Sequence, residues 1–183
     1  MSATGLDVFD KTLQTTNIWL DEVMADVGPD RQVAWHVLGA VLRALRDRIP
    51  ADLAAHLGAQ LPLLVRGSYY DGYRPSQPAD RSRDQDAFLG NVNERLADTR
   101  PVNARDAVTS VFGVLSAHLP RGQCERVRDA LPADIKVLWH LDEARQTSRE
   151  DKAGTGRAAQ HAQEARRFRA RHGAAANDGG SRE

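Results

Sequence analysis

The chain has 183 residues, of which 41% are hydrophobic and 27% charged. This length and composition are typical of a globular protein with a real core and exclude a chain that is disordered throughout. The 25 basic and 25 acidic residues cancel, but residues 145–183 hold nine basic residues against five acidic ones, so the C-terminal tail is basic.

Cysteine content and hydropathy limit the location of the protein. The single cysteine, Cys124, excludes an internal disulfide and any multi-cysteine metal site, and it fits a reducing compartment. No apolar run approaches the roughly 20 residues that a membrane span needs, and the N-terminus lacks the pattern of a secretory signal. We therefore expect a cytoplasmic protein without a membrane span.

The first predicted helix runs from about Asp7 to Val27. Its apolar side recurs at spacings of four and three, which places one set of side chains on one helix face: Phe9, Leu13, Thr16, Leu20, Val23 and Val27. Asp7 is the predicted N-cap, because a carboxylate there can accept hydrogen bonds from the first free amides. Gly28-Pro29 ends the helix.

The second predicted helix runs from about Asp30 to Arg48 and buries a set of five apolar residues, Val37, Leu38, Val41, Leu42 and Leu45. We expect Arg43, Arg46 and Arg48 on or near its solvent side. Ile49-Pro50 ends this helix, and a short third helix follows until Pro62, where one more helical turn begins.

A repeat then emerges. The stretch Ala34–Gly67 aligns without gaps with Ala104–Val137 when the sequence is shifted by 70 positions, and the matches are apolar positions and helix-breaking prolines. A fixed offset of this kind suggests duplication. No segment alternates with the period of a strand, so the fold class is all-α.

We predict a helical bundle built from two sequence-related repeats of three to four helices. The repeats cover about residues 6–66 and 86–140, with a linker at 67–85, and together form a domain at 6–141. Residues 142–183 have little apolar surface to bury and are predicted to be a basic, flexible tail, disordered or partly helical.

Several runs of residues resemble a known family. AVLRALRDRIP, HLGAQLP and LVRGSYYDGYRP, followed by HLP and a closing LPADIKVLW, resemble the bacterial domain-of-unknown-function family 2267, over about residues 8–141. The resemblance implies a small, all-helical prokaryotic protein with no established activity. It carries no catalytic residues over to this chain, and the tail lies outside it.

The sequence contains no phosphate loop, dinucleotide fingerprint, HExxH or nucleophile-elbow motif. Asp52 and His56 lie one helical turn apart but are too few ligands for a closed metal site, so a surface pair is the better interpretation. Cys124 is expected to be a small buried hydrophobe, with a redox role as the alternative. We predict no catalytic residues, no metal and no cofactor, and an enzyme is the less favoured class.

The stretch RGSYYDGYRP is the most distinctive one, because the second repeat lacks it. Its rings either pack across the end of the bundle or form a recognition surface for a protein partner, as amphipathic rings beside arginines often do. The candidate partner-binding residues are Tyr69, Tyr70, Tyr73, Arg66 and Arg74.

The leading functional hypothesis is a non-catalytic binding or regulatory module for another macromolecule. The first alternative is association with nucleic acid through tail arginines, of which Arg166, Arg167, Arg169 and Arg171 are the densest group. A second alternative is a small-ligand binder or enzyme with a site between the repeats, using groups such as Arg66, Asp52, His56 or His118.

Overall fold

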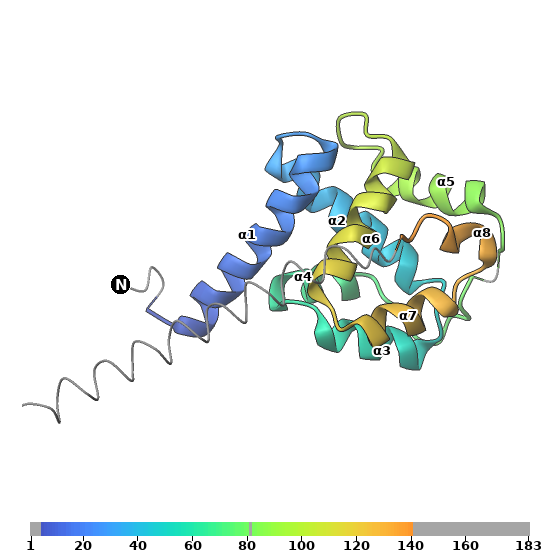
Figure 1. Ribbon diagram of the computed structural model, residues 1–183, viewed down its shortest axis with the longest axis horizontal. Coiled ribbons are helices and arrows are strands. Elements are labelled where there is room, and N and C mark those ends of the chain that lie inside the picture. The colour runs from blue at the N-terminus through green and yellow to red at the C-terminus, as the bar shows by residue number, and fades with distance from the viewer. Residues whose placement is uncertain (1–4, 81, 141–183) are drawn as a thin grey trace, which may run out of the picture. The chain divides into compact units, whose positions relative to one another are not determined.

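Every regular element that the computed structural model shows is a helix. It describes residues 5–80 and 82–140, and no strand occurs in these residues, so the all-α prediction is confirmed (Figure 1). In chain order the helices are α1 (Asp7–Val27), α2 (Arg31–Arg46), α3 (Ala51–Gln60), α4 (Leu63–Tyr70), α5 (Gln85–Arg95), α6 (Ala104–His118), α7 (Arg121–Asp129) and α8 (Ala133–Lys136).

Two kinds of residue precede the helices α2 to α8. Asp30, Asp84 and Asn103 accept hydrogen bonds from the first free amides of α2, α5 and α6. The other starts, at α3, α4, α7 and α8, follow prolines in extended backbone, Pro50, Pro62, Pro120 and Pro132. Proline fits there because it cannot continue the preceding helix and needs no amide partner.

The predicted cap of α1 was wrong. Asp7 is the first residue of α1 itself, and Leu6, which stands at the cap position, makes no side-chain cap. Asp7 still lies in the first turn, where its negative charge is favourable beside the positive end of the helix dipole.

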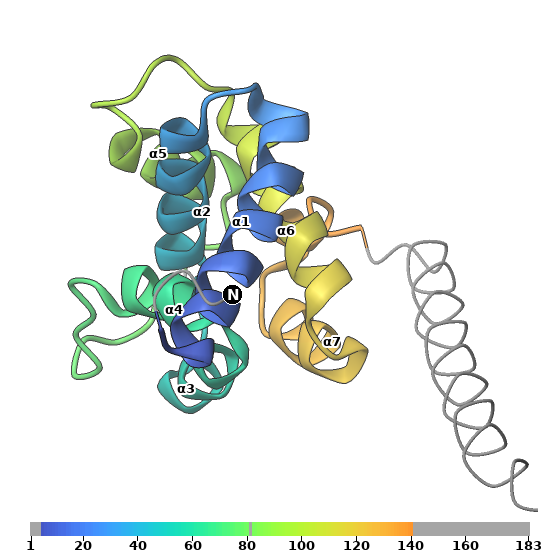
Figure 2. The same ribbon diagram turned by 90° about the vertical axis from the view of Figure 1, so that its left-hand side faces the viewer.

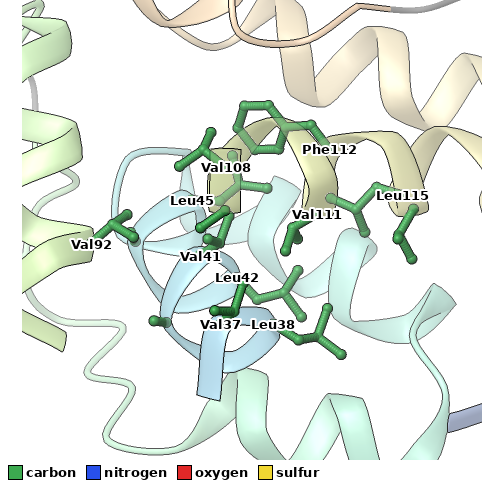
Figure 3. Packing of buried hydrophobic residues seen from close by; sticks show 14 of the residues in the cluster. Val37, Leu38, Val41, Leu42, Leu45, Val92, Val108, Val111, Phe112 and Leu115 are labelled. Carbon is green, nitrogen blue, oxygen red and sulfur yellow. The ribbon is translucent and has the colours of Figure 1, made fainter. Parts of the chain in front are cut away.

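The core is centred on α2 and α6, which pack on each other and each contact α1 and α5. Figure 3 shows their apolar side chains pointing toward one another, with Val92 of α5 beside them. The labelled residues are all buried: Val37, Leu38, Val41, Leu42, Leu45, Val92, Val108, Val111, Phe112 and Leu115. The apolar periodicity of the sequence therefore identifies this interface correctly.

The shorter helices surround this pair. The helix α4 packs on α1, α2 and α3, while α7 contacts α3 and α6, and α8 contacts α5 (Figures 1 and 2). Each is too short to be stable alone, and its buried face against the neighbouring helices holds it in place. Within the described part of the chain, no helix combines the length and the apolar character that crossing a bilayer requires.

The connection between α4 and α5 is shorter than the linker predicted at 67–85. The helix α4 continues through Gly67 to Tyr70, because Val65 and Tyr69 are one turn apart and both buried, and no proline intervenes before Asp71-Gly72. The connection therefore spans residues 71–84, and we refer to it as the linker.

The sequence offset reappears in the helix starts. The helices α3 and α7 begin at Ala51 and Arg121, and α4 and α8 begin at Leu63 and Ala133, so both pairs of starts are 70 positions apart. The helices at equivalent positions differ in length, since α4 has 8 residues and α8 has 4. The duplication itself stays a prediction from the sequence.

Candidate functional site

Arginines near the C-terminal end of α2 are the most unusual residues of the interior. Arg46 is 3% exposed and Arg48 is 6% exposed, so the prediction that they lie on the solvent side was wrong. A buried charge is costly unless it is paired and hydrogen-bonded, and both guanidinium groups meet that condition. Burial also lowers the pKa of the nearby Arg43, and the positive charge of Arg95 acts in the same direction.

Arg46 closes the C-terminal end of α4. Its Nη1 donates to the carbonyl oxygens of Tyr69 and Asp71, the latter at 3.0 Å, and its Nε donates to Asp47 Oδ1 at 2.8 Å. Its guanidinium carbon lies 4.7 Å from the centre of the Tyr73 ring. The last carbonyls of a helix have no intrahelical partner, and here a side chain from another helix supplies one.

Arg48 and Asp47 fix the far end of the linker. Arg48 Nη1 donates to the Ser82 carbonyl at 2.6 Å, and its Nη2 lies 3.0 Å from Asp80 Oδ2. The backbone carbonyl of Asp47 accepts from the Asp80 amide at 2.8 Å, and its Oδ2 accepts from Arg95 Nη2 at 2.9 Å. The linker is thus held to the end of α2 by charge-assisted hydrogen bonds.

A small pocket lies between the end of α2 and the first part of the linker. It encloses about 100 Å³, and its polar groups come from Arg46, Asp47, Tyr73, Arg74 and Gln77. Gly72 lies in the wall of the pocket, where the backbone turns from α4 into the linker. Its φ of +63° lies in the left-handed region that favours glycine.

The tyrosines predicted as a recognition surface are built into the fold to different degrees. Tyr69 is fully buried, and its hydroxyl donates to the Ala54 carbonyl at 2.9 Å, so a partner cannot reach it in this conformation. Tyr70 and Tyr73 are half-buried against the core. The Tyr70 ring contacts the edge of Tyr69, with 5.0 Å between ring centres, and covers Gly58 of α3.

The two arginines of the same prediction have different surroundings. Arg66 Nη2 donates to the carbonyls of Ala59 and Leu61, both at 3.0 Å, and so caps the end of α3. Arg74 is exposed on the linker and lines the pocket. The predicted anion-binding residues of the tail, Arg166, Arg167, Arg169 and Arg171, lie outside the described residues.

The remaining candidates are dispersed. Asp52 and His56 are both exposed on α3. His118, on α6, has its Nε2 2.8 Å from Glu22 Oε1 of α1, so this imidazole ties two helices together. Among the described residues, no group of three or more histidine, cysteine or acidic side chains could hold a metal ion. Cys124 is buried, as predicted from its place on the helix.

Sequence periodicity missed one surface. Phe9 and Leu13 share a helix face with the buried Leu20, and that pattern is typical of a core position, yet they are 47% and 45% exposed. No residue between 7 and 15 is buried, because the first two turns of α1 extend past the helices on which its second half packs (Figure 1). The helix α4 contacts α1, and its first turn carries the exposed Leu63 and Leu64.

Comparison with curated proteins finds no match for this chain. The model of the family described as "Uncharacterized conserved protein (DUF2267)" matches residues 16–138, which is more than half of the sequence and includes every helix from α2 to α8. The chain therefore belongs to the DUF2267 family of uncharacterized conserved proteins.

Proposed function

We propose that this protein is a non-catalytic module that binds another protein through the exposed apolar face of α1. The observation that carries the proposal is the exposure of Phe9 and Leu13 on the same helix face as buried core residues. Large apolar side chains grouped on one face mark interaction surfaces more often than single exposed ones do. We call Phe9 and Leu13 the α1 face.

The chemistry of the α1 face defines what it can bind. Covering the exposed part of Phe9 and Leu13, about half of each residue, contributes roughly 1 kcal/mol each, because complete burial of such a side chain is worth about 1.5–3 kcal/mol. By helical spacing, Asp10 and Thr12 lie on either side of the face, so polar residues border an apolar centre, as in many protein interfaces. The complementary surface is an apolar helix or groove on the partner.

A pair of matched positions tests this proposal. A photo-crosslinking residue placed at position 13 is expected to give a specific protein crosslink in cells, while the same residue at position 18 gives none. Ile18 is a suitable control because it is also exposed, at 42%, but points away from the α1 face. In the chain that carries the crosslinker at position 13, Phe9→Ser should abolish the crosslinked product and leave the thermal midpoint unchanged. Equal crosslinking at both positions contradicts the proposal.

The predicted partner surface at the tyrosines remains a second proposal, supported by the partly exposed Tyr70 and Tyr73 rings and by the exposed Arg74. In this proposal Tyr69 and Arg66 shape the surface from below and do not contact the partner. Loss of partner capture in Tyr73→Ala at unchanged thermal stability supports it, and an equal loss of stability assigns the ring to packing.

Association with nucleic acid through the tail is also proposed, on the excess of basic residues in 145–183. Counterion release makes such binding fall steeply with added salt. Binding that survives deletion of 145–183, or that ignores salt, excludes this role.

A further inference from the structure

The pocket beside Arg46 has an unusual wall, because a buried guanidinium lines it. Three of the hydrogen bonds of Arg46 lead into the protein, through Nε to Asp47 and through Nη1 to two carbonyls. The side chain is 3% exposed. An arginine in this position has five donors, so these contacts leave the Nη2 group to be accounted for.

Nη2 keeps a small contact with solvent. No group in residues 5–80 or 82–140 accepts a hydrogen bond from it, and it is not among the enclosed, unpartnered side-chain atoms, of which Arg66 Nε and Trp19 Nε1 are examples. A donor that is neither paired nor enclosed must keep contact with water. Because the side chain is otherwise covered, the pocket that Arg46 lines is where this contact occurs.

The charge around the pocket favours an anion. Arg46 and Arg74 line it with two positive charges, against one negative charge from Asp47. Both oxygens of Asp47 already accept from arginines, Oδ1 from Arg46 at 2.8 Å and Oδ2 from Arg95 at 2.9 Å. Arg74 has no charged partner among the described residues, so its charge is available to a ligand.

We propose that this pocket binds the anionic group of a small molecule, a carboxylate or a phosphate, between Arg46 and Arg74. Guanidinium groups suit such oxyanions because their donors match ligand oxygens, and here Arg46 offers the two hydrogens of Nη2 while Arg74 can offer two nitrogens at once. The volume of about 100 Å³ is smaller than the roughly 150 Å³ that holds a benzene ring, so the pocket admits the anionic group while the rest of the molecule extends into solvent. This site shares no residue with the α1 face and stands independently of it.

The pocket is formed before the ligand arrives. The bonds of Arg46 to the end of α4 fix the orientation of its guanidinium plane, and the ring of Tyr73 lies against it. The linker backbone is held in turn by the hydrogen bond from the Gln77 amide to the Arg74 carbonyl, at 3.0 Å. A preformed site loses less entropy on binding than one that must be ordered.

Titration of the ¹⁵N-labelled full chain with sodium phosphate, and separately with sodium acetate, tests the proposal. Sodium chloride keeps the ionic strength constant, and the Nε–Hε signal of Arg46 and the amide of Arg74 report binding by NMR. We expect a saturable shift with a dissociation constant in the millimolar range, typical of so small a ligand. The anion that saturates identifies the ligand class.

Two variants with the same change in net charge make the test specific. Arg74→Gln should weaken binding at least about fivefold, because it removes one of the two guanidinium groups of the site. Arg83→Gln should leave binding unchanged, because Arg83 is an exposed linker arginine outside the pocket. Thermal melts of both variants should match the parent chain.

Three results would overturn the proposal. They are the absence of a saturable shift with either anion, an equal loss of binding in Arg74→Gln and Arg83→Gln, and a saturable shift that Arg74→Gln leaves unchanged. An equal loss in both variants means that the anion responds only to the overall charge of the surface.

Discussion

Cys124 lies beneath the end of α6, where its Sγ donates to the Leu115 carbonyl at 3.5 Å. Burial raises the pKa of this thiol to about 11, because the thiolate would lose its hydration. The thiol is therefore neutral and covered at physiological pH. A reactive cysteine needs a lowered pKa and access to solvent, and Cys124 has neither, which favours packing over the redox role considered as an alternative.

The raised pKa makes a signed prediction for stability. In the unfolded chain the thiol ionises near pH 8.5, while in the folded protein it stays neutral to about pH 11. The contribution of Cys124 to stability is thus complete below about pH 8.5 and is lost as the pH rises toward 11. At about 1.4 kcal/mol per pKa unit, the loss amounts to a few kcal/mol.

Urea unfolding at pH 7.5 and pH 10.5, with reductant, measures this loss. In Cys124→Ala the free energy of unfolding should fall less between the two pH values than in the parent chain, since other titrating groups are common to both. An identical pH dependence in the two proteins contradicts the prediction. In the native parent chain at pH 7.5, a thiol reagent should react only after denaturant is added.

At the scale of the element, sequence periodicity predicts where α2 and α6 bury their apolar faces but not what happens at helix ends. Phe9 and Leu13 follow the periodicity of core residues and are exposed, because periodicity reports the face of a helix and not how far its neighbours extend. Arg46 and Arg48 look like solvent-facing residues and are buried, because their acceptors are backbone carbonyls some 23 to 34 positions away. Every residue has a backbone carbonyl, so the residue types do not show which carbonyls will accept from a distant arginine. The pocket beside Arg46 depends on these hydrogen bonds, and it was therefore not predictable from the sequence.

The contact between α3 and α4 gives a prediction for two helical glycines. A methyl group at Gly58 would lie 2.7 Å from Tyr70 Cζ and 2.9 Å from its Cε2, so the ring, which now packs on Tyr69, must shift. At Gly67 of α4 a methyl group meets no atom within 4 Å. Alanine stabilises a helix relative to glycine by about 1 kcal/mol at either site, and this gain cancels when the two variants are compared.

Gly67→Ala is therefore expected to raise the free energy of unfolding by about 0.5–1 kcal/mol. The free energy of unfolding of Gly58→Ala is expected to be about 1–3 kcal/mol lower than that of Gly67→Ala, which is the usual cost of overpacking. Chemical denaturation of both variants measures the difference. If both alanines stabilise the protein equally, the Tyr70 ring is free to move and its packing on α3 contributes little.

At the scale of the whole molecule, the two halves of the chain share one core. The helix α6 of the second half packs on α1 and α2 of the first, and α5 packs on α2 as well. Of the apolar side chains that meet there, Val41 and Leu45 belong to the first half, and Val111 and Phe112 to the second (Figure 3). Each half therefore covers part of its apolar surface with the other half, as expected for two predicted repeats that pack into one bundle.

This arrangement predicts that neither half folds alone. A fragment ending at residue 80 keeps α1 to α4 but leaves the α6-facing sides of α1 and α2 in water, and a chain of that length has little core to spare. Its NMR spectrum should lack dispersed amide signals, as should that of a fragment covering 81–140, whereas an equimolar mixture of the two should regain dispersion. The intact chain should unfold in one transition. A cooperative melt of the first fragment by itself would show that the helices of one half suffice for a core, and that the interface between α2 and α6 joins two finished units.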